Sequence, residues 1–241
     1  ALVARAAEAG MTTVALTDRD GTYGAVRFVR ACQDAGLGEV LGVDLAPGMV
    51  ERTRQEMSHV PQVRVALGDA ENPPPRGGGW DAAIAALLLF YLPDPVASSA
   101  RTREVLRSGG VLVVSTFDSP DERWSIVEAA LSPYWPPSVG PSHPSGASPF
   151  ATVESTEQIL RDAGYVDIDT EIIEHVNTYT DVDHWLQWTW SGGARGMWER
   201  VPASDLPAAQ SAAKAVVSSL ADADGTLTEL FRVRLTRAVA P

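Results

Sequence analysis

EVLGVDLAPGMVERTRQEMSHVPQVRVALGD, the stretch over residues 39–69, decides the fold of this chain. Its short apolar runs predict one strand over Glu39–Leu45 and another over Val63–Asp69, and the amphipathic segment between them predicts a helix from Pro47 to about Ser58. Strands that are apolar along most of their length are typical of a parallel sheet whose two faces are both covered.

The same alternation of strands and helices continues on both sides of this stretch. Before it, Met11–Leu16 predicts a strand that leads through a turn-rich loop into a helix ending at Gly36. After it, the predicted order is strand Asp81–Leu89, helix Pro95–Arg107 and strand Val111–Phe117. The pattern predicts a doubly wound, Rossmann-like α/β fold, with a mostly parallel sheet, right-handed crossovers and helices on both faces. A ligand is then expected at the carboxyl ends of the strands.

The second half of the chain continues with a helix near Asp121–Leu131 and a loop over Pro133–Phe150, whose six prolines are too many for a helix or a central strand. Ser155 and Gln158 have the spacing of a capping box and predict a helix over Thr156–Ala163. The other expected elements are a strand over Val166–His175, a helical segment in which Trp185 and Trp188 favour core packing, and an antiparallel C-terminal strand over Thr226–Val239 at the sheet edge.

Charge and cysteine content limit the possible partners and the expected location. The chain of 241 residues has 19 Lys and Arg against 31 Asp and Glu, a formal net charge of −12, which argues against nucleic acid as a partner. Cys32 is the only cysteine in the sequence, so it allows no intramolecular disulfide and no cluster of zinc-binding thiolates. No stretch approaches the roughly 20 apolar residues of a membrane span. We expect a cytoplasmic protein without a membrane partner.

Asp44 stands where a nucleotide-binding fold places its ribose-binding acid, at the end of the second predicted strand and just before a helix. A carboxylate at that place accepts hydrogen bonds from both ribose hydroxyls. The alternative is an ordinary helix N-cap ahead of Pro47. A nicotinamide cofactor would also suit Asp44, but the G-x-G-x-x-G spacing that such cofactors require is missing.

Four segments together resemble a known family. EVLGVDLAPGMVERTR, VRVALGDAENPP, WDAAIAALLLFYLPDP and REVLRSGGVLVVSTFD are similar, in order and spacing, to successive motifs of the UbiE-like class I S-adenosylmethionine-dependent methyltransferases. The likeness runs from about Glu39 to Pro241 and implies S-adenosylmethionine as cofactor and a small-molecule methyl acceptor. It also implies that LRSGG, residues 106–110, is the turn before the fifth strand.

The resemblance implies a role for each strand-end residue. Asp44 would hold the ribose, Leu45 and Met49 would flank the adenine, Asp69 and Ala70 would contact the adenine edge, and Ala86 and Leu87 would line the methionine side.

The first loop departs from the family pattern of acid-x-Gly-x-Gly-x-Gly. It reads TDRDGTYGA, with only Gly21 and Gly24, and Asp20 stands where a glycine would let the backbone approach the cofactor. We still expect Asp20, Gly21 and Gly24 to be cofactor-contacting positions. The alternative is a methyltransferase-fold scaffold that is catalytically inactive because this loop, with the bulky Tyr23, blocks the pocket.

Residues 1–37 resemble a different family, the PHP domain at the N-terminus of bacterial error-prone DNA polymerase III α subunits. The resemblance implies a hybrid chain, in which residues 1–37 form a PHP-like strand, loop and helix that complete the sheet. Residues 38–241 would form the methyltransferase-like domain, with a helical insertion at about 176–222. Arg19 occupies the place of a PHP metal ligand and the other ligands have no counterpart, so we expect no metal.

Methyl transfer requires little beyond placement, because the sulfonium is already an activated donor. A general base helps only where the acceptor must lose a proton. The candidates for that role are three histidines, His143 in the proline-rich loop, His175 and His184 beside Trp185, together with Tyr91 just past the fourth predicted strand.

Overall fold

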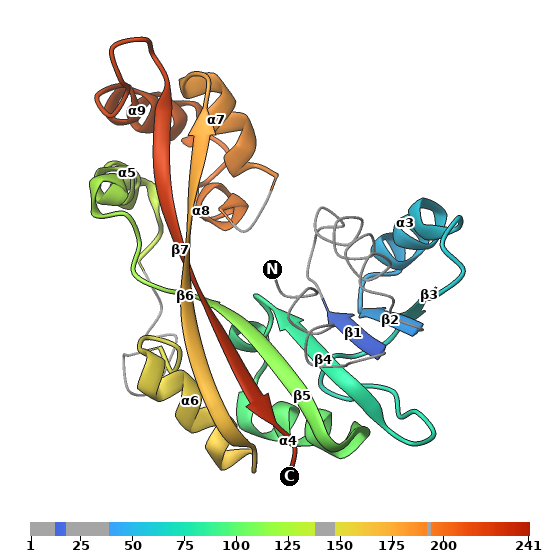
Figure 1. Cartoon of the computed structure of the whole chain (residues 1–241). Helices are drawn as coiled ribbons and strands as arrows, with labels where there is room; N and C mark the ends of the chain where they lie inside the picture. The colour runs from blue at the N-terminus through green and yellow to red at the C-terminus, as the bar shows by residue number, and fades with distance from the viewer. Residues whose placement is uncertain (1–12, 18–38, 138–147, 192–193) are drawn as a thin grey trace. The chain divides into compact units, whose positions relative to one another are not determined.

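The computed structural model describes residues 13–17, 39–137, 148–191 and 194–241 (Figure 1). The chain divides into two compact units. Unit 1 comprises Ala1–Phe117, Pro149–Ile172 and Val233–Pro241, and unit 2 comprises Asp118–Ser148 and Ile173–Arg232. Residues 1–37 of the expected hybrid lie outside the described residues, apart from 13–17.

A seven-stranded sheet in the order β3-β2-β1-β4-β5-β7-β6 organises the chain. Its strands are β1 Thr13–Thr17, β2 Glu39–Asp44, β3 Val63–Leu67, β4 Trp80–Ala86, β5 Leu106–Phe117, β6 Val166–Tyr179 and β7 Leu227–Val239. The first five are parallel, and β7 is antiparallel to β5. The predicted doubly wound α/β fold is confirmed, with its strand order reversing between β1 and β4.

The C-terminal strand is antiparallel as predicted, but its expected place at the sheet edge is wrong. β7 pairs with β5 from Val111↔Val239 to Phe117↔Val233, and β6 takes the edge. The side chains explain the order, because Thr236 and Ala238 of β7 are fully buried, as an inner strand requires. β6 instead has exposed acids along its length, as is common for edge strands, which must not pair with other chains.

The helices of unit 1 cover both faces of the sheet. They are α3 Pro47–Met57, the 3-10 turn η1 Leu89–Tyr91, α4 Pro95–Val105 and α6 Val153–Asp162. From β2 through α3 to β3 the chain moves away from β1 in one direction across the sheet, and from β4 through α4 to β5 it moves away in the opposite direction. Because both crossovers are right-handed, α3 and α4 lie on opposite faces of the sheet.

The capping box of α6 differs from the predicted one. Thr152 is the N-cap, with its hydroxyl accepting from the Ser155 backbone N–H at 3.1 Å and Ser155 Oγ accepting from the Thr152 N–H at 3.2 Å. The helix therefore begins one turn earlier than expected. Gln158 bonds to Asp162 within the helix and takes no part in the cap.

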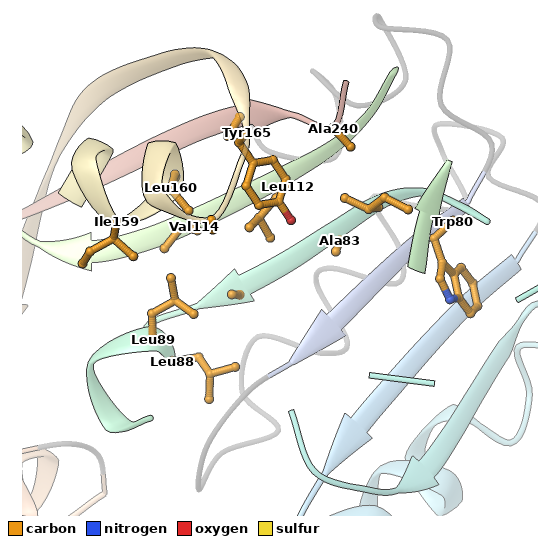
Figure 2. Packing of buried hydrophobic residues seen from close by; sticks show 14 of the residues in the cluster. Trp80, Ala83, Leu88, Leu89, Leu112, Val114, Ile159, Leu160, Tyr165 and Ala240 are labelled. Atoms are coloured by element: carbon orange, nitrogen blue, oxygen red, sulfur yellow. The ribbon is translucent and has the colours of Figure 1, made fainter. Parts of the chain in front are cut away.

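The main core of unit 1 packs α4 and α6 against β4 and β5 (Figure 2). Val114 and Leu160 are fully buried at its centre. Tyr165 is also buried, and its hydroxyl donates to the Ser99 carbonyl at 3.1 Å. Burial raises the pKa of Tyr165, so this hydroxyl remains a neutral donor.

The LRSGG segment is a bulged start of β5 and not a separate turn. Trp80 pairs with Leu106 and Ala82 with Val111, so the residues between Leu106 and Val111 bulge out of register. Gly109 adopts φ +73° there and donates its N–H to the Ala240 carbonyl at 2.9 Å. This left-handed conformation favours glycine.

Unit 2 is a helical cluster together with residues 173–179 of β6 and 227–232 of β7. It contains η2 Glu122–Trp124, α5 Ser125–Leu131, η3 Ser132–Tyr134, α7 Val182–Thr189, α8 Arg195–Glu199 and α9 Leu206–Ser218. Trp185 and Trp198 are buried with ring centroids 6.2 Å apart, and Trp198 Nε1 donates to Thr189 Oγ1 at 2.9 Å. Trp188 packs against the same cluster, in agreement with the predicted core role.

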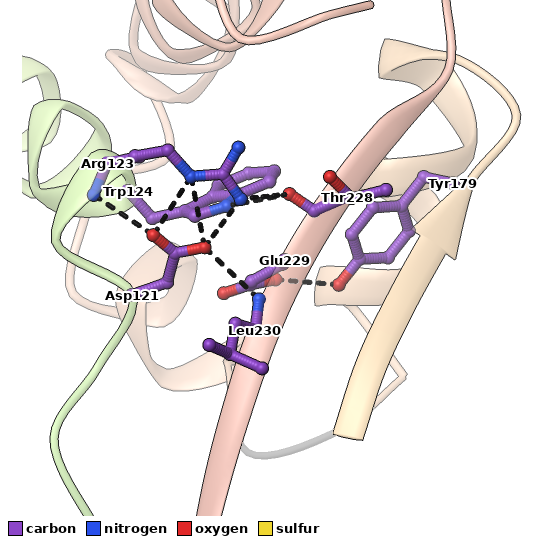
Figure 3. Close-up of polar contacts among 7 residues, drawn as sticks. All are labelled: Asp121, Arg123, Trp124, Tyr179, Thr228, Glu229 and Leu230. Atoms are coloured by element: carbon purple, nitrogen blue, oxygen red, sulfur yellow. Dashed lines mark hydrogen bonds and ion pairs between the residues drawn. The ribbon is translucent and has the colours of Figure 1, made fainter. Parts of the chain in front are cut away.

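Two polar contacts involve β7 within unit 2 (Figure 3). One joins β7 to Asp121, just before η2, and the other joins β7 to β6. Asp121 pairs with Arg123 at 2.7 Å and accepts from the Leu230 N–H at 3.2 Å, and these contacts lower the pKa of Asp121 to about 2. Tyr179 donates its hydroxyl to Glu229 at 2.8 Å. Burial raises the pKa of Glu229.

Candidate cofactor site at the carboxyl edge of the sheet

The strand register brings the carboxyl ends of β1 to β5 to one edge of the sheet (Figure 1). The pairs nearest this edge are Asp44↔Leu67, Thr17↔Val43, Thr17↔Ala85 and Ala86↔Ser115. Asp44 and Ala86 each lie one residue beyond the row that contains Thr17, on the two strands that flank β1. The predicted contacts of ribose and methionine therefore lie on either side of the same strand end.

Asp44 is the last residue of β2 and is partly buried. Its Oδ1 accepts from the Ala46 N–H at 2.7 Å, and its carbonyl accepts from the Gly68 N–H at 3.0 Å. The N-cap of α3 is Ala46 and has no side-chain cap, so Asp44 is not the ordinary N-cap that was the alternative. The carboxylate instead closes a short turn, which fixes its direction.

Asp69 uses the same device two residues after β3. Its Oδ1 accepts from the Glu71 N–H at 2.9 Å, and its carbonyl accepts from the Asn72 N–H at 2.9 Å. Both acids are thus held by their own backbone at neighbouring strand ends. Ala70, next to Asp69, packs against the core and lines a small apolar cavity of about 40 Å³ on the α4 face.

Apolar side chains lie exposed beside these acids. Leu45 is 67% exposed and Leu67 is 57% exposed, and Met49 lies partly buried in the first turn of α3. Exposed leucines beside a carboxylate provide surface for the flat face of a base. The sequence interpretation missed Leu67, although its place two residues before Asp69 at a strand end was a usable signal.

Leu87 has an unusual backbone conformation directly after β4. Its φ is +49°, in the left-handed region, which costs a side-chain-bearing residue about 1–2 kcal/mol. Its N–H donates to Ser115 Oγ at 2.9 Å and is within 3.2 Å of the Ser115 carbonyl. This turn ends β4 at Ala86, three residues before the predicted end of the strand.

An aromatic group follows Leu87. Phe90 lies 4.6 Å from Tyr91, 5.8 Å from Phe117 and 6.2 Å from Phe150, measured between ring centroids. Tyr91 is 45% exposed and Phe117 is 47% exposed. Tyr91 was a candidate base, whereas the sequence interpretation missed the other three rings, because Phe90 and Phe117 lie in ordinary apolar runs and Phe150 closes the proline-rich loop.

The histidine candidates that the structure describes belong to unit 2. His184 is in α7 of unit 2, where its Nδ1 accepts from the Thr180 N–H at 3.1 Å and its ring lies 5.8 Å from that of Tyr179. His175 is exposed on β6 of the same unit. The other predicted positions, Asp20, Gly21, Gly24 and His143, lie outside the described residues.

Two absences apply only to the part of the chain that the structure describes. No three His, Cys, Asp or Glu side chains come together there as a metal site. No helix of that part is both long and apolar enough to cross a bilayer.

Comparison with known proteins identifies the family. Nocamycin O-methyltransferase of Saccharothrix syringae is 31% identical over 192 residues, which cover 74% of this chain and 68% of that protein. The chain belongs to the class I S-adenosylmethionine-dependent methyltransferases. The family model of the methyltransferase domain matches residues 20–114.

A further relative is similar to this methyltransferase in sequence, and a solved structure is similar to it in fold. Aklanonic acid methyltransferase DauC of Streptomyces sp. strain C5 is 31% identical over 123 residues, so the chain spans about half of that protein, 52%. A putative methyltransferase of Bacillus halodurans has the same fold, with a TM-score of 0.59 and 14% identity over 99% of this chain and 98% of that one.

A separate, short similarity concerns the expected hybrid. The error-prone DNA polymerase of Corynebacterium efficiens is 51% identical over 45 residues, which are 19% of this methyltransferase and 4% of the polymerase. The methyltransferase match already begins at residue 20, before the expected junction after residue 37. So short a similarity does not establish a hybrid chain.

Proposed function

We propose that this methyltransferase transfers a methyl group from S-adenosylmethionine to a hydroxyl of a small polyketide-like molecule. The observation that carries the proposal is the pair of backbone-fixed carboxylates, Asp44 and Asp69, at neighbouring strand ends of the carboxyl edge. Carboxylates whose direction is already fixed bind hydroxyl and amino donors with little loss of side-chain entropy.

The residues at this edge fit the cofactor's parts. Asp44 would accept hydrogen bonds from the ribose hydroxyls, and Asp69 would accept one from the adenine amino group. An ionised carboxylate can only accept hydrogen bonds, and these groups are donors. Exposed Leu45 and the nearby Met49 would cover the faces of the adenine, with Ala70 at its edge.

At the other side of β1, Ala86 and Leu87 would line the methionine end. The bound cofactor supplies a methyl group that its sulfonium already activates. The chain's part is to place that methyl group and the acceptor in line and to exclude water.

Two observations support a polyketide-like acceptor. The relatives named above methylate nocamycin and aklanonic acid, by their names. In this chain the exposed rings of Tyr91 and Phe117 follow the proposed methionine-side residues along the same edge, and they suit a flat or apolar acceptor. Among the base candidates that the structure describes, Tyr91 is the one that belongs to unit 1, together with this edge of the sheet.

The test is methyl transfer itself. We expect the protein to bind S-adenosylhomocysteine in a calorimetric titration and to transfer labelled methyl from S-adenosylmethionine to hydroxylated polyketides. Transfer with no dependence on the acceptor's hydroxyl would overturn the acceptor class. Absence of cofactor binding would overturn the activity and leave the inactive scaffold as the function.

The inactive scaffold is the second candidate, because the first loop, TDRDGTYGA, has only Gly21 and Gly24 where the family has three glycines. We propose with it that residues 1–37 are a PHP-like strand, loop and helix completing the sheet, joined to a domain over 38–241 with a helical insertion at about 176–222. Polymerase similarity over 45 residues supports the first part. A cytoplasmic location, no metal and no nucleic-acid or membrane partner belong to the same proposal.

A further inference from the structure

We propose that Ser115 is a positioning residue for the cofactor: its hydroxyl holds the peptide of Leu87 in the left-handed conformation at the end of β4. The inference rests on the proposed function, because the residue it positions is the proposed methionine-side contact. Nothing in the family match assigns a role to Ser115.

The contact joins two strands whose ends define the site. Ser115 is 6% exposed and lies in β5 opposite Ala86. The Leu87 N–H, one residue farther along β4, donates to Ser115 Oγ at 2.9 Å. The Ser115 carbonyl lies 3.2 Å from the same N–H, so this one peptide is held by both polar atoms that Ser115 offers as acceptors.

The conformation needs such support. A leucine at φ +49° is strained by its Cβ, and the same residue without a restraint would return to negative φ. That rotation would swing the peptide between Ala86 and Leu87, which are the two residues proposed to line the methionine side. The hydroxyl of Ser115 therefore determines how this stretch of backbone faces the cofactor.

The experiment compares Ser115→Ala with a matched control, Thr116→Val. The Thr116 hydroxyl is also buried, at 1% residue exposure, and has no hydrogen-bond partner among the described residues. We expect Ser115→Ala to weaken S-adenosylhomocysteine binding by about fivefold to tenfold, the factor for one lost buried hydrogen bond. Thr116→Val should leave the affinity unchanged.

A double-mutant cycle separates positioning from simple loss of stability. Glycine adopts φ +49° without strain, so in a Leu87→Gly background the Ser115→Ala change should cost less than twofold in affinity. Melting temperatures are measured in parallel. A purely structural role would lower the melting temperature of Ser115→Ala and leave its affinity, measured well below that temperature, equal to that of the parent.

The possible results separate the positioning role of Ser115 from the proposed function. If the parent binds and Ser115→Ala binds equally well, or if the loss is the same in the Leu87→Gly background, the positioning role is wrong and the proposed function stands. If the parent protein does not bind S-adenosylhomocysteine, the proposed function is overturned and this inference with it.

Discussion

Replacing Asp44 by alanine tests the cofactor site most directly. The substitution removes the carboxylate that would accept from the ribose hydroxyls, and each charge-assisted hydrogen bond contributes about 1.5–3 kcal/mol. Asp44 is only partly buried, so water compensates part of the loss. We expect S-adenosylhomocysteine binding to weaken by about 1–3 kcal/mol, roughly 5- to 150-fold.

The substitution has a second effect that must be separated from the first. It also removes the 2.7 Å bond from the Ala46 N–H, which fixes the turn into α3. Asp44→Asn keeps an oxygen for this turn and loses the charge, so it should fold like the parent and still bind weakly. Asp224→Ala is the matched control, since Asp224 also accepts from the N–H two residues ahead, that of Thr226, at 3.0 Å, but belongs to unit 2.

Isothermal titration of the four proteins, with circular dichroism as a check of folding, gives the answer. We expect weak binding by both Asp44 variants and normal binding by the Asp224 variant. Parent-like affinity in Asp44→Ala would refute the ribose role. Weakening in all three variants would indicate a general loss of folded protein.

Asp69, the first loop and Glu229 each allow a further test. Asp69→Ala should weaken S-adenosylhomocysteine and adenosine alike, because both present the same adenine amino group; a titration in which only one ligand suffers contradicts the adenine role. Asp20→Gly should raise the affinity for S-adenosylmethionine, and Tyr23→Gly should raise it again, because each removes bulk or charge from the proposed loop; submicromolar binding by the parent, or no gain in either variant, would show that the loop already works. Burial raises the pKa of Glu229 above its unfolded value, so its contribution to stability is present at low pH and is lost as the pH rises through the folded pKa. Glu229→Gln keeps an acceptor for the Tyr179 hydroxyl. In urea unfolding from pH 4 to 8, the free energy of unfolding of this variant should fall less with rising pH than that of the parent. An unchanged pH dependence would exclude Glu229 as its cause.

Local pattern was sufficient for most elements of the sheet. β2 and α3 each start at the predicted residue and end one residue before the predicted end, because apolar period and a proline at the helix start are properties of the nearby sequence. Asp44 and Asp69 were found in the same way, as acids at the ends of apolar runs. Their role at the cofactor stays a prediction.

Other features depended on contacts between residues far apart in the chain. The run from Ala86 to Phe90 looks like a continuing strand, yet β4 ends at Ala86 because the Leu87 peptide bonds to Ser115, 28 positions away. The exposure of Leu67 and the grouping of Phe117 with Phe90 likewise arise from neighbouring strands and not from local sequence.

The sequence by itself determined the alternation of strands and helices, and with it the doubly wound fold and the strand-end acids, because periodic burial is encoded residue by residue. Only the tertiary structure decided that β7 lies between β5 and β6, that the chain forms two units, and that Leu87 is held in a strained turn. Strand order and backbone strain are set by hydrogen bonds and packing between segments that are distant in the chain, and no local pattern records which distant segment a strand will meet.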